Sequence, residues 1–243
     1  MGTGLPQTRA PLRAEPLPVE LMNTVWADRD GVHDALADPL EALGWLHAVA
    51  EADVRVHGGV SLHRAIGIGV GAFDLMAADA ASGTEPAQSA EGTEATKAAL
   101  LTFTRRLVGL RDALRRLAAD ATGDPRPAAE SAVHVHEEAV DIVNRSSALG
   151  RSWSRLVWPP GGEPGSELRT GGEPADLVLA ILAEEGVALF ADPGRPGLRA
   201  CLAPGCVLYF TDANPRREWC SAACGNRARV ARHYQRRHQR AED

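Results

Sequence analysis

Hydrophobic residues recur every three or four positions in four segments of the chain, and this spacing predicts amphipathic helices. The expected helices cover 38–53, 97–119, 128–147 and 174–190. The first has a strong start signal, because Asp38 can cap it, Pro39 occupies the first helical position and Glu41 completes the cap. The second has the clearest apolar face, formed by Phe103, Leu107, Leu110, Leu114 and Leu117.

The remaining pattern predicts a β-hairpin and three loop regions. Strands are expected at 154–158 and 167–170, on either side of a loop rich in proline and glycine. Segment 80–96 has no large apolar residue and is expected to be a flexible insertion. The proline-rich segment 1–18 is expected to be a mobile lead-in. The prolines and glycines of 191–197 predict a linker between a helical domain over 19–190 and a module over 198–241.

Five arginines lie off the apolar stripe of the second helix, at positions 105, 106, 111, 115 and 116. We expect a solvated helix surface there. A face that binds an anionic ligand is the alternative.

Length and composition exclude several protein classes. The chain has 243 residues, 44% of them hydrophobic, and no apolar run of the roughly 20 residues that a membrane helix needs. No secretory signal is recognisable in 1–20, so we expect a cytoplasmic protein without a membrane partner. The net charge of -6 hides an asymmetry, because residues 195–243 contain ten arginines and only four acidic residues. This asymmetry suggests two modules with different partners.

All four cysteines lie in the basic module. Cys201, Cys206, Cys220 and Cys224 form two close pairs joined by a short loop. This is the spacing of a closed tetrahedral zinc site with four thiolate ligands, which is structural and not catalytic. Two disulfides, free buried thiols and an iron–sulfur cluster are the alternatives.

The residues around the cysteines predict a small α+β module. Pro204-Gly205 can turn the first cysteine loop, and Val207–Phe210 favours a strand that returns through Arg217–Trp219 after a turn. Ser221 can cap a helix whose first turn contains Cys224. Knuckle, hairpin and helix together resemble a treble clef. The whole chain is therefore expected to be α+β and mainly helical.

The helix after Cys224 is the candidate nucleic-acid interface. A face rich in arginine suits phosphate groups, because the guanidinium is always charged and forms forked hydrogen bonds. An acidic protein partner and an inert charged surface are the alternatives. The candidate contacts are Arg227, Arg229, Arg232, Arg236, Arg237 and Arg240.

The string Trp219-Cys220-Ser221-Ala222-Ala223-Cys224-Gly225-Asn226-Arg227 resembles the CGNR zinc-finger family. Leu21-Met22-Asn23-Thr24 resembles the start of the ABATE domain that usually precedes this finger. The resemblance implies a bacterial, stress-related transcription regulator whose finger binds double-stranded DNA. It also implies an N-terminal domain that senses a small-molecule effector or mediates assembly. Because a single finger offers few base contacts, a homodimer formed through the helical domain is a further hypothesis.

Within that domain, Asn23 and Thr24 are candidates for lining a ligand pocket, with local capping of the backbone as the alternative. His134 and Glu138 are four residues apart and could share a helix face, but two ligands do not make a catalytic metal site. We therefore expect no enzyme. A zinc-stabilised module that binds an acidic protein is the alternative function, and it predicts protein binding without a preference for duplex DNA.

Overall fold

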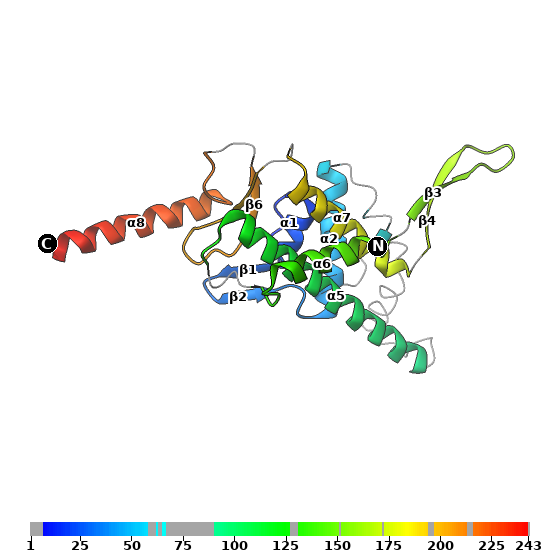
Figure 1. The fold of residues 1–243 in the computed structure, drawn as a ribbon, viewed down its shortest axis with the longest axis horizontal. Helices are drawn as coiled ribbons and strands as arrows, with labels where there is room; N and C mark the ends of the chain where they lie inside the picture. Colours follow the sequence, from blue (N-terminus) through cyan, green and yellow to red (C-terminus); the bar gives the residue numbers. More distant parts are fainter. Residues whose placement is uncertain are drawn as a thin grey trace.

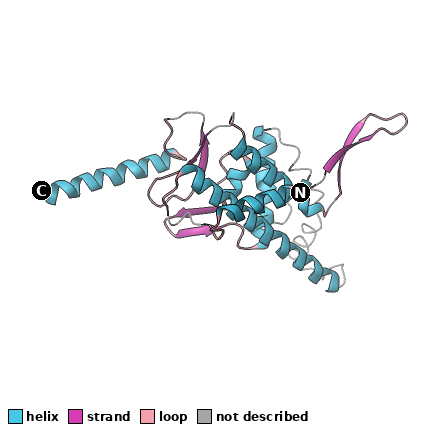
Figure 2. Ribbon diagram, viewed as in Figure 1, coloured by secondary structure: helices cyan, strands magenta, loops and turns pink. Residues whose placement is uncertain are grey.

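The computed structural model describes residues 7–57, 62, 65–66, 90–126, 131–150, 152–171, 173–193, 197–212 and 216–242. Its helices, except the last, surround one apolar core, and the cysteine module has a small core of its own. Its strands form three small hairpins (Figures 1 and 2). The elements in chain order are α1 (Leu17–Met22), β1 (Val25–Asp28), β2 (Gly31–Asp34), α2 (Pro39–His57), α5 (Ala90–Thr122), α6 (His136–Ser147), β3 (Ser152–Val157), β4 (Gly165–Thr170), α7 (Pro174–Ala191), β5 (Gly197–Ala200), β6 (Tyr209–Asp212) and α8 (Ala222–Glu242).

Helix α5 is the centre of the fold, because α1, α2, α6 and α7 all pack against it. Four residues of its predicted apolar stripe are buried, and Leu117 is partly buried. The predicted start of α2 is confirmed, since the Asp38 carboxylate accepts hydrogen bonds from the backbone N–H groups of Leu40 and Glu41. Helix α7 begins at Pro174 as expected.

Two helices differ from the predicted bounds. Helix α6 begins at His136 instead of 128, because the Ser131 hydroxyl donates to the carbonyl of Asp112 and accepts from the N–H of Val133, which holds this stretch as a loop. Helix α5 begins at Ala90, so 90–96 is helical where we expected a flexible insertion. An ion pair between Glu94 and Lys97 supports this first part. Residues 80–89 lie outside the described chain.

Two further expectations are corrected by burial. Within the described part of the lead-in, Ala10 and Glu15 are buried and α1 begins at Leu17, so 7–18 packs on the core. Arg111 and Arg115 are also buried, so they are not part of a solvated helix surface. Arg111 forms an ion pair with Asp34 at 2.5 Å, which compensates its desolvation.

The hairpin β3–β4 forms as predicted and stands away from the helical body (Figure 2). Its register places Trp153 opposite Arg169 and Arg155 opposite Glu167. Trp153, Leu156 and the following Trp158 are all more than half exposed. In the part of the chain that the structure describes, none of the helices combines the length and the apolar character needed to cross a bilayer.

The pairing in the cysteine module differs from the expected one. Strand β6 pairs with the upstream strand β5, in an antiparallel register that puts Gly197 opposite Asp212, and not with Arg217–Trp219. Both strands lie against the helical domain, β5 beside α5 and β6 beside α1. Helix α8 extends from this module away from the rest of the molecule (Figure 1).

Candidate metal centre and nucleic-acid interface

The first cysteine pair lies at the tip of the β5–β6 hairpin. The backbone N–H of Cys201 donates to the carbonyl of Leu208 at 3.0 Å, which continues the strand pairing past Ala200. The loop then turns at Gly205, whose φ of +72° lies in the left-handed region that favours glycine. The N–H of Cys206 donates to the carbonyl of Ala203 at 2.9 Å and closes the knuckle.

The second pair lies at the start of α8, as the sequence predicts. Cys220 lies two residues before the first residue of α8, and its N–H points at the Cys201 sulfur, 3.4 Å away. The Ser221 hydroxyl caps the helix by accepting from the N–H of Cys224 at 3.2 Å. Gly225 packs so closely on Trp219 that a Cβ at this position would lie 3.0 Å from the indole Cδ1.

The four sulfur atoms of Cys201, Cys206, Cys220 and Cys224 form one buried cluster, in which all lie within 4.8 Å of one another. The Cys206 and Cys220 sulfurs are 3.9 Å apart, and those of Cys220 and Cys224 are 3.5 Å apart. Sulfurs bound about 2.3 Å from a tetrahedral zinc ion lie about 3.8 Å apart, so the cluster fits this metal.

The electrostatics of the cluster also suit a bound cation. Hydrogen bonds from the Cys206 and Cys220 thiols lower the pKa of Cys201, whereas the interaction with Cys201 raises the pKa of Cys206 to about 12. Four adjacent thiols therefore do not all ionise to thiolates unless a positive ion neutralises the charge. The cysteines form the structural zinc site that their spacing predicts.

Two arginines of the finger attach directly to this site. Arg227 donates from Nη2 to the Cys224 sulfur at 3.2 Å. Arg217 donates from Nη2 to the Cys220 carbonyl at 2.8 Å and lies over the Phe210 ring. Arg227, which the sequence indicated as a candidate nucleic-acid contact, is thus placed at the metal site.

Asn23 is bonded to the finger. Its amide donates to the Tyr209 carbonyl at 3.0 Å and accepts from the Tyr209 N–H at 2.9 Å, so both polar atoms are used. The Thr24 hydroxyl donates to the Leu21 carbonyl at 2.8 Å, which is the local capping alternative. Both residues therefore have structural roles inside the fold, and their role in lining a ligand pocket stays a prediction.

Further polar contacts tie the finger to the helical domain. Glu15 accepts from both the N–H and the hydroxyl of Thr211, at 2.8 and 2.7 Å. The Tyr209 ring lies between two guanidinium groups, with its centroid 5.4 Å from Arg115 and 5.1 Å from Arg126. The Tyr209 hydroxyl donates to Asp124 at 2.8 Å. Burial, together with this hydrogen bond, raises the pKa of Tyr209 to about 12.

The predicted nucleic-acid contacts lie along α8. Arg229, Arg232, Arg236 and Arg237 are all exposed, and the side chain of Arg240 lies outside the described residues. The guanidinium of Arg232 lies 5.8 Å from the Trp219 ring centroid, and Arg229 donates to Asn226. The structure therefore brings Arg229, Arg232, Arg236 and Arg237 onto one projecting helix, and it does not bring Asn23 or Thr24 near them.

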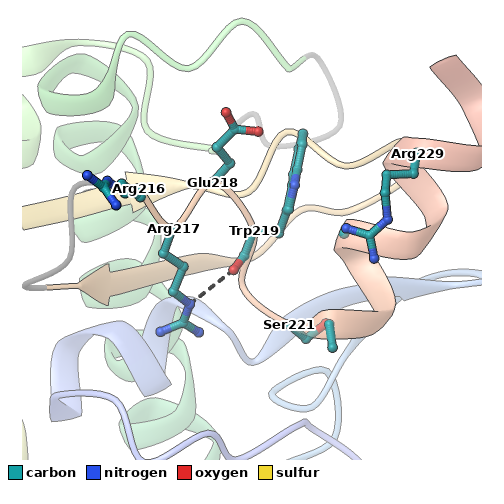
Figure 3. Close-up of a pocket in the computed structure, with 8 residues that line it drawn as sticks. Arg216, Arg217, Glu218, Trp219, Ser221 and Arg229 are labelled. Atoms are coloured by element: carbon teal, nitrogen blue, oxygen red, sulfur yellow. Dashed lines mark hydrogen bonds between the residues drawn. The ribbon is translucent and has the colours of Figure 1, made fainter.

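A hollow of about 530 Å³ lies at the base of α8 (Figure 3). Trp219 and Arg229 face each other across it, and Ser221 lies at its lower edge. A second hollow of about 500 Å³ shares Glu218 and Trp219 with the first. Trp219 therefore lines both hollows, and it lies beside Arg229 and Arg232 of α8.

Sequence reasoning missed the residues of the helical domain that hold the finger. Asp124 and Arg126 belong to a stretch that reads only as a helix break, and Glu15 lies in the expected lead-in. Their partners are distant in sequence, so no local signal identifies them. His134 and Glu138 do not share a helix face, because α6 begins after His134.

Comparison with known families gives two matches. Residues 15–193 match the ABATE family, described as "Putative stress-induced transcription regulator", and residues 197–237 match the CGNR zinc finger. No curated protein and no solved structure gave a match. The first match covers more than half of the chain, and the second coincides with the four-cysteine module. The chain therefore belongs to the ABATE family and carries a CGNR zinc finger after its ABATE domain.

Proposed function

We propose that this protein is a DNA-binding transcription regulator in which the finger and α8 contact duplex DNA. The observation that carries the proposal is the exposure of Arg229, Arg232, Arg236 and Arg237 on a helix that extends away from the body (Figure 1). Among the residues that the structure describes, most of α8 packs against no other helix or strand. The family's description as a transcription regulator agrees with this role.

The proposed division of labour follows from the chemistry of the parts. Zinc fixes the start of α8 through Cys220 and Cys224, so the helix leaves the finger in a defined direction. The arginines bind backbone phosphates, which position a protein on DNA without reading its sequence. Val230 and Tyr234, both more than half exposed on α8, supply apolar surface for contacts with base edges such as the thymine methyl group.

We assign no enzymatic step to the chain, and we propose that the ABATE domain senses an effector or mediates assembly. Asn23, Glu15 and their partners in the finger support this arrangement, because a change in the helical domain reaches the finger through direct hydrogen bonds.

We also propose that two copies pair, because a single finger with one helix offers few base contacts. The surface we assign is the hairpin β3–β4, since an isolated two-stranded sheet with unpaired edges is marginally stable in water. An antiparallel pairing of β4 with a second copy, with Leu168 opposite itself, places Glu167 opposite Arg169 of the second copy twice over. This strand is therefore complementary in charge to itself.

Duplex DNA binding by the zinc-loaded protein, measured by fluorescence anisotropy over a salt series, tests the main proposal. We expect affinity to fall steeply with salt. The variant Arg232→Glu/Arg236→Glu should bind much more weakly, and its log-log salt slope should be smaller by about 2, because each phosphate contact contributes about 0.9.

The matched control is Arg105→Glu/Arg145→Glu, which makes the same change of net charge at exposed positions of the helical domain. It should leave binding close to that of the unchanged protein. Equal loss in both variants would show that only overall charge matters. No binding at low salt would contradict the proposal and favour the alternative, an acidic protein partner for α8.

A further inference from the structure

Arg126 belongs to the ABATE domain but points into the zinc finger. It follows α5 by four residues, and its side chain is only 12% exposed. Its Nη1 donates to three carbonyl oxygens of the knuckle, those of Cys201 at 2.8 Å, Cys206 at 3.0 Å and Leu208 at 3.3 Å. One guanidinium nitrogen thus holds the backbone of both metal ligands in the first cysteine pair.

The remaining guanidinium nitrogens fix the orientation of this contact. Nε and Nη2 donate to the two carboxylate oxygens of Asp124, at 2.7 and 2.6 Å. The Tyr209 ring lies beneath the guanidinium, and its hydroxyl bonds the same carboxylate. Burial raises the pKa of Asp124, but the hydrogen bonds from Arg126 and Tyr209 outweigh it and hold the pKa below its usual value. Asp124 is therefore a charged anchor for Arg126.

The negative charge of the metal site favours positively charged side chains beside it. Four thiolates and one zinc ion carry a formal charge of two minus, and burying such a centre is costly unless positive groups surround it. Each cysteine contacts an arginine: Arg227 bonds the Cys224 sulfur, Arg217 bonds the Cys220 carbonyl, and Arg126 bonds the carbonyls of Cys201 and Cys206. Arg217 and Arg227 belong to the finger, whereas Arg126 comes from the other domain.

We propose that Arg126 is a positioning residue of the zinc site, through which the ABATE domain sets how firmly the finger retains its metal. When the loop that carries Asp124 and Arg126 shifts, the knuckle loses the three hydrogen bonds that hold the backbone of Cys201 and Cys206. The dependence is mutual, because two coupled sites affect each other by the same free energy. Loss of zinc therefore loosens this loop.

The test measures zinc transfer from the full-length, zinc-loaded protein to an excess of a chromogenic chelator. We expect Arg126→Met, which keeps the stem and removes the charged fork, to release zinc about 10 to 100 times faster, the range typical for partners of metal ligands. The matched control is Arg106→Met, which breaks an ion pair with Asp176 within the helical domain. It should release zinc at the unchanged rate.

Two milder variants keep the test decisive if Arg126→Met fails to fold. Arg126→Lys keeps the charge but cannot bond Asp124 and the knuckle together, and Asp124→Asn keeps Arg126 but removes its charged anchor. Both should release zinc faster than the unchanged protein while the circular dichroism of the zinc-loaded forms stays the same. A role in overall stability alone would not speed release in a fully folded variant.

Hydrogen exchange of the backbone supplies the second readout. In the unchanged protein, removal of zinc should increase exchange in 120–126, and in Arg126→Lys this response to zinc should shrink. Release at the unchanged rate in all folded variants would overturn the proposal. Equal acceleration in Arg106→Met would also overturn it. No DNA is present in these measurements, so their result is independent of whether the protein binds DNA.

Discussion

Asn23 and Tyr209 are 186 residues apart in the sequence, yet they are joined by two hydrogen bonds. The Asn23 amide meets the N–H and the carbonyl of Tyr209 in the way that a neighbouring strand would. This contact satisfies two backbone groups of β6 that are buried against the helical domain. The finger is therefore fixed to the helical domain by direct hydrogen bonds.

This relationship predicts a large effect for Asn23→Ala. The substitution leaves the N–H and the carbonyl of Tyr209 buried without partners, at a cost of about 1–3 kcal/mol for each such group. We expect the free energy of unfolding to fall by about 2–4 kcal/mol, measured by urea denaturation of the zinc-loaded protein. Asn144→Ala, at an exposed position of α6, is the control and should change it by less than about 0.5 kcal/mol. Similar effects of the two variants would contradict the role we give to Asn23.

Two glycines in helices should respond in opposite directions to alanine. At Gly225 a new Cβ meets the Trp219 ring at 3.0 Å, so Gly225→Ala should destabilise the finger by about 1–3 kcal/mol. At Gly109 in α5 a Cβ has no described atom within 4 Å, so Gly109→Ala should stabilise the protein by about 0.5–1 kcal/mol. Thermal unfolding of both variants checks this pair. A stabilising Gly225→Ala would show that Trp219 moves aside freely.

Glu20 predicts a specific dependence of stability on pH. Burial raises its pKa more than the hydrogen bonds from the backbone N–H groups of Glu15 and Arg13 lower it. Because the folded pKa lies above the unfolded value of 4.5, the folded state holds this proton longer. The contribution of Glu20 to stability is thus full below pH 4.5 and is lost as the pH rises through the folded pKa.

Glu20→Gln removes this titration while keeping an oxygen that can accept the two hydrogen bonds. Relative to the unchanged protein, the variant should therefore gain stability between about pH 4 and pH 7. Urea denaturation at the two pH values measures the difference. Parallel pH dependence in the two proteins would show that Glu20 titrates normally in the fold.

The pairing proposed for β4 predicts a charge-swap pattern. Glu167→Arg alone, or Arg169→Glu alone, places like charges opposite each other between the two copies and should weaken the dimer. The double variant Glu167→Arg/Arg169→Glu restores opposite charges between copies and should restore the dimer. In the double variant, as in Glu167→Arg, residue 167 repels Arg155 inside the hairpin. A dimer restored in the double variant is therefore due to the contact between the two copies.

Sedimentation equilibrium of the full-length protein at several concentrations measures this effect. A monomer at every concentration would rule out the dimer. A dimer of unchanged strength in both single variants would rule out this register.

Local patterns in the sequence determined much of this protein. The stripe from Phe103 to Leu114 specifies α5, Asp38 and Pro39 start α2, and the spacing of the cysteines specifies the zinc site. These signals are local, because helix periodicity, capping and chelation each involve residues within a few turns or one short loop of each other. The exposed arginines of α8 follow from the same kind of pattern.

Only the tertiary structure decided how the two domains join. Arg115 reads as a surface charge, Arg126 as part of a helix break and Asn23 as a pocket residue. All three nevertheless bond to the backbone of the finger. The pairing of β6 with β5 in place of Arg217–Trp219 was likewise not encoded locally. Buried polar groups must find partners wherever the packed chain supplies them, and those partners lie 75 to 186 residues away. Sequence periodicity reports which face of an element is apolar, but it carries no information about which distant carbonyl a buried arginine will meet.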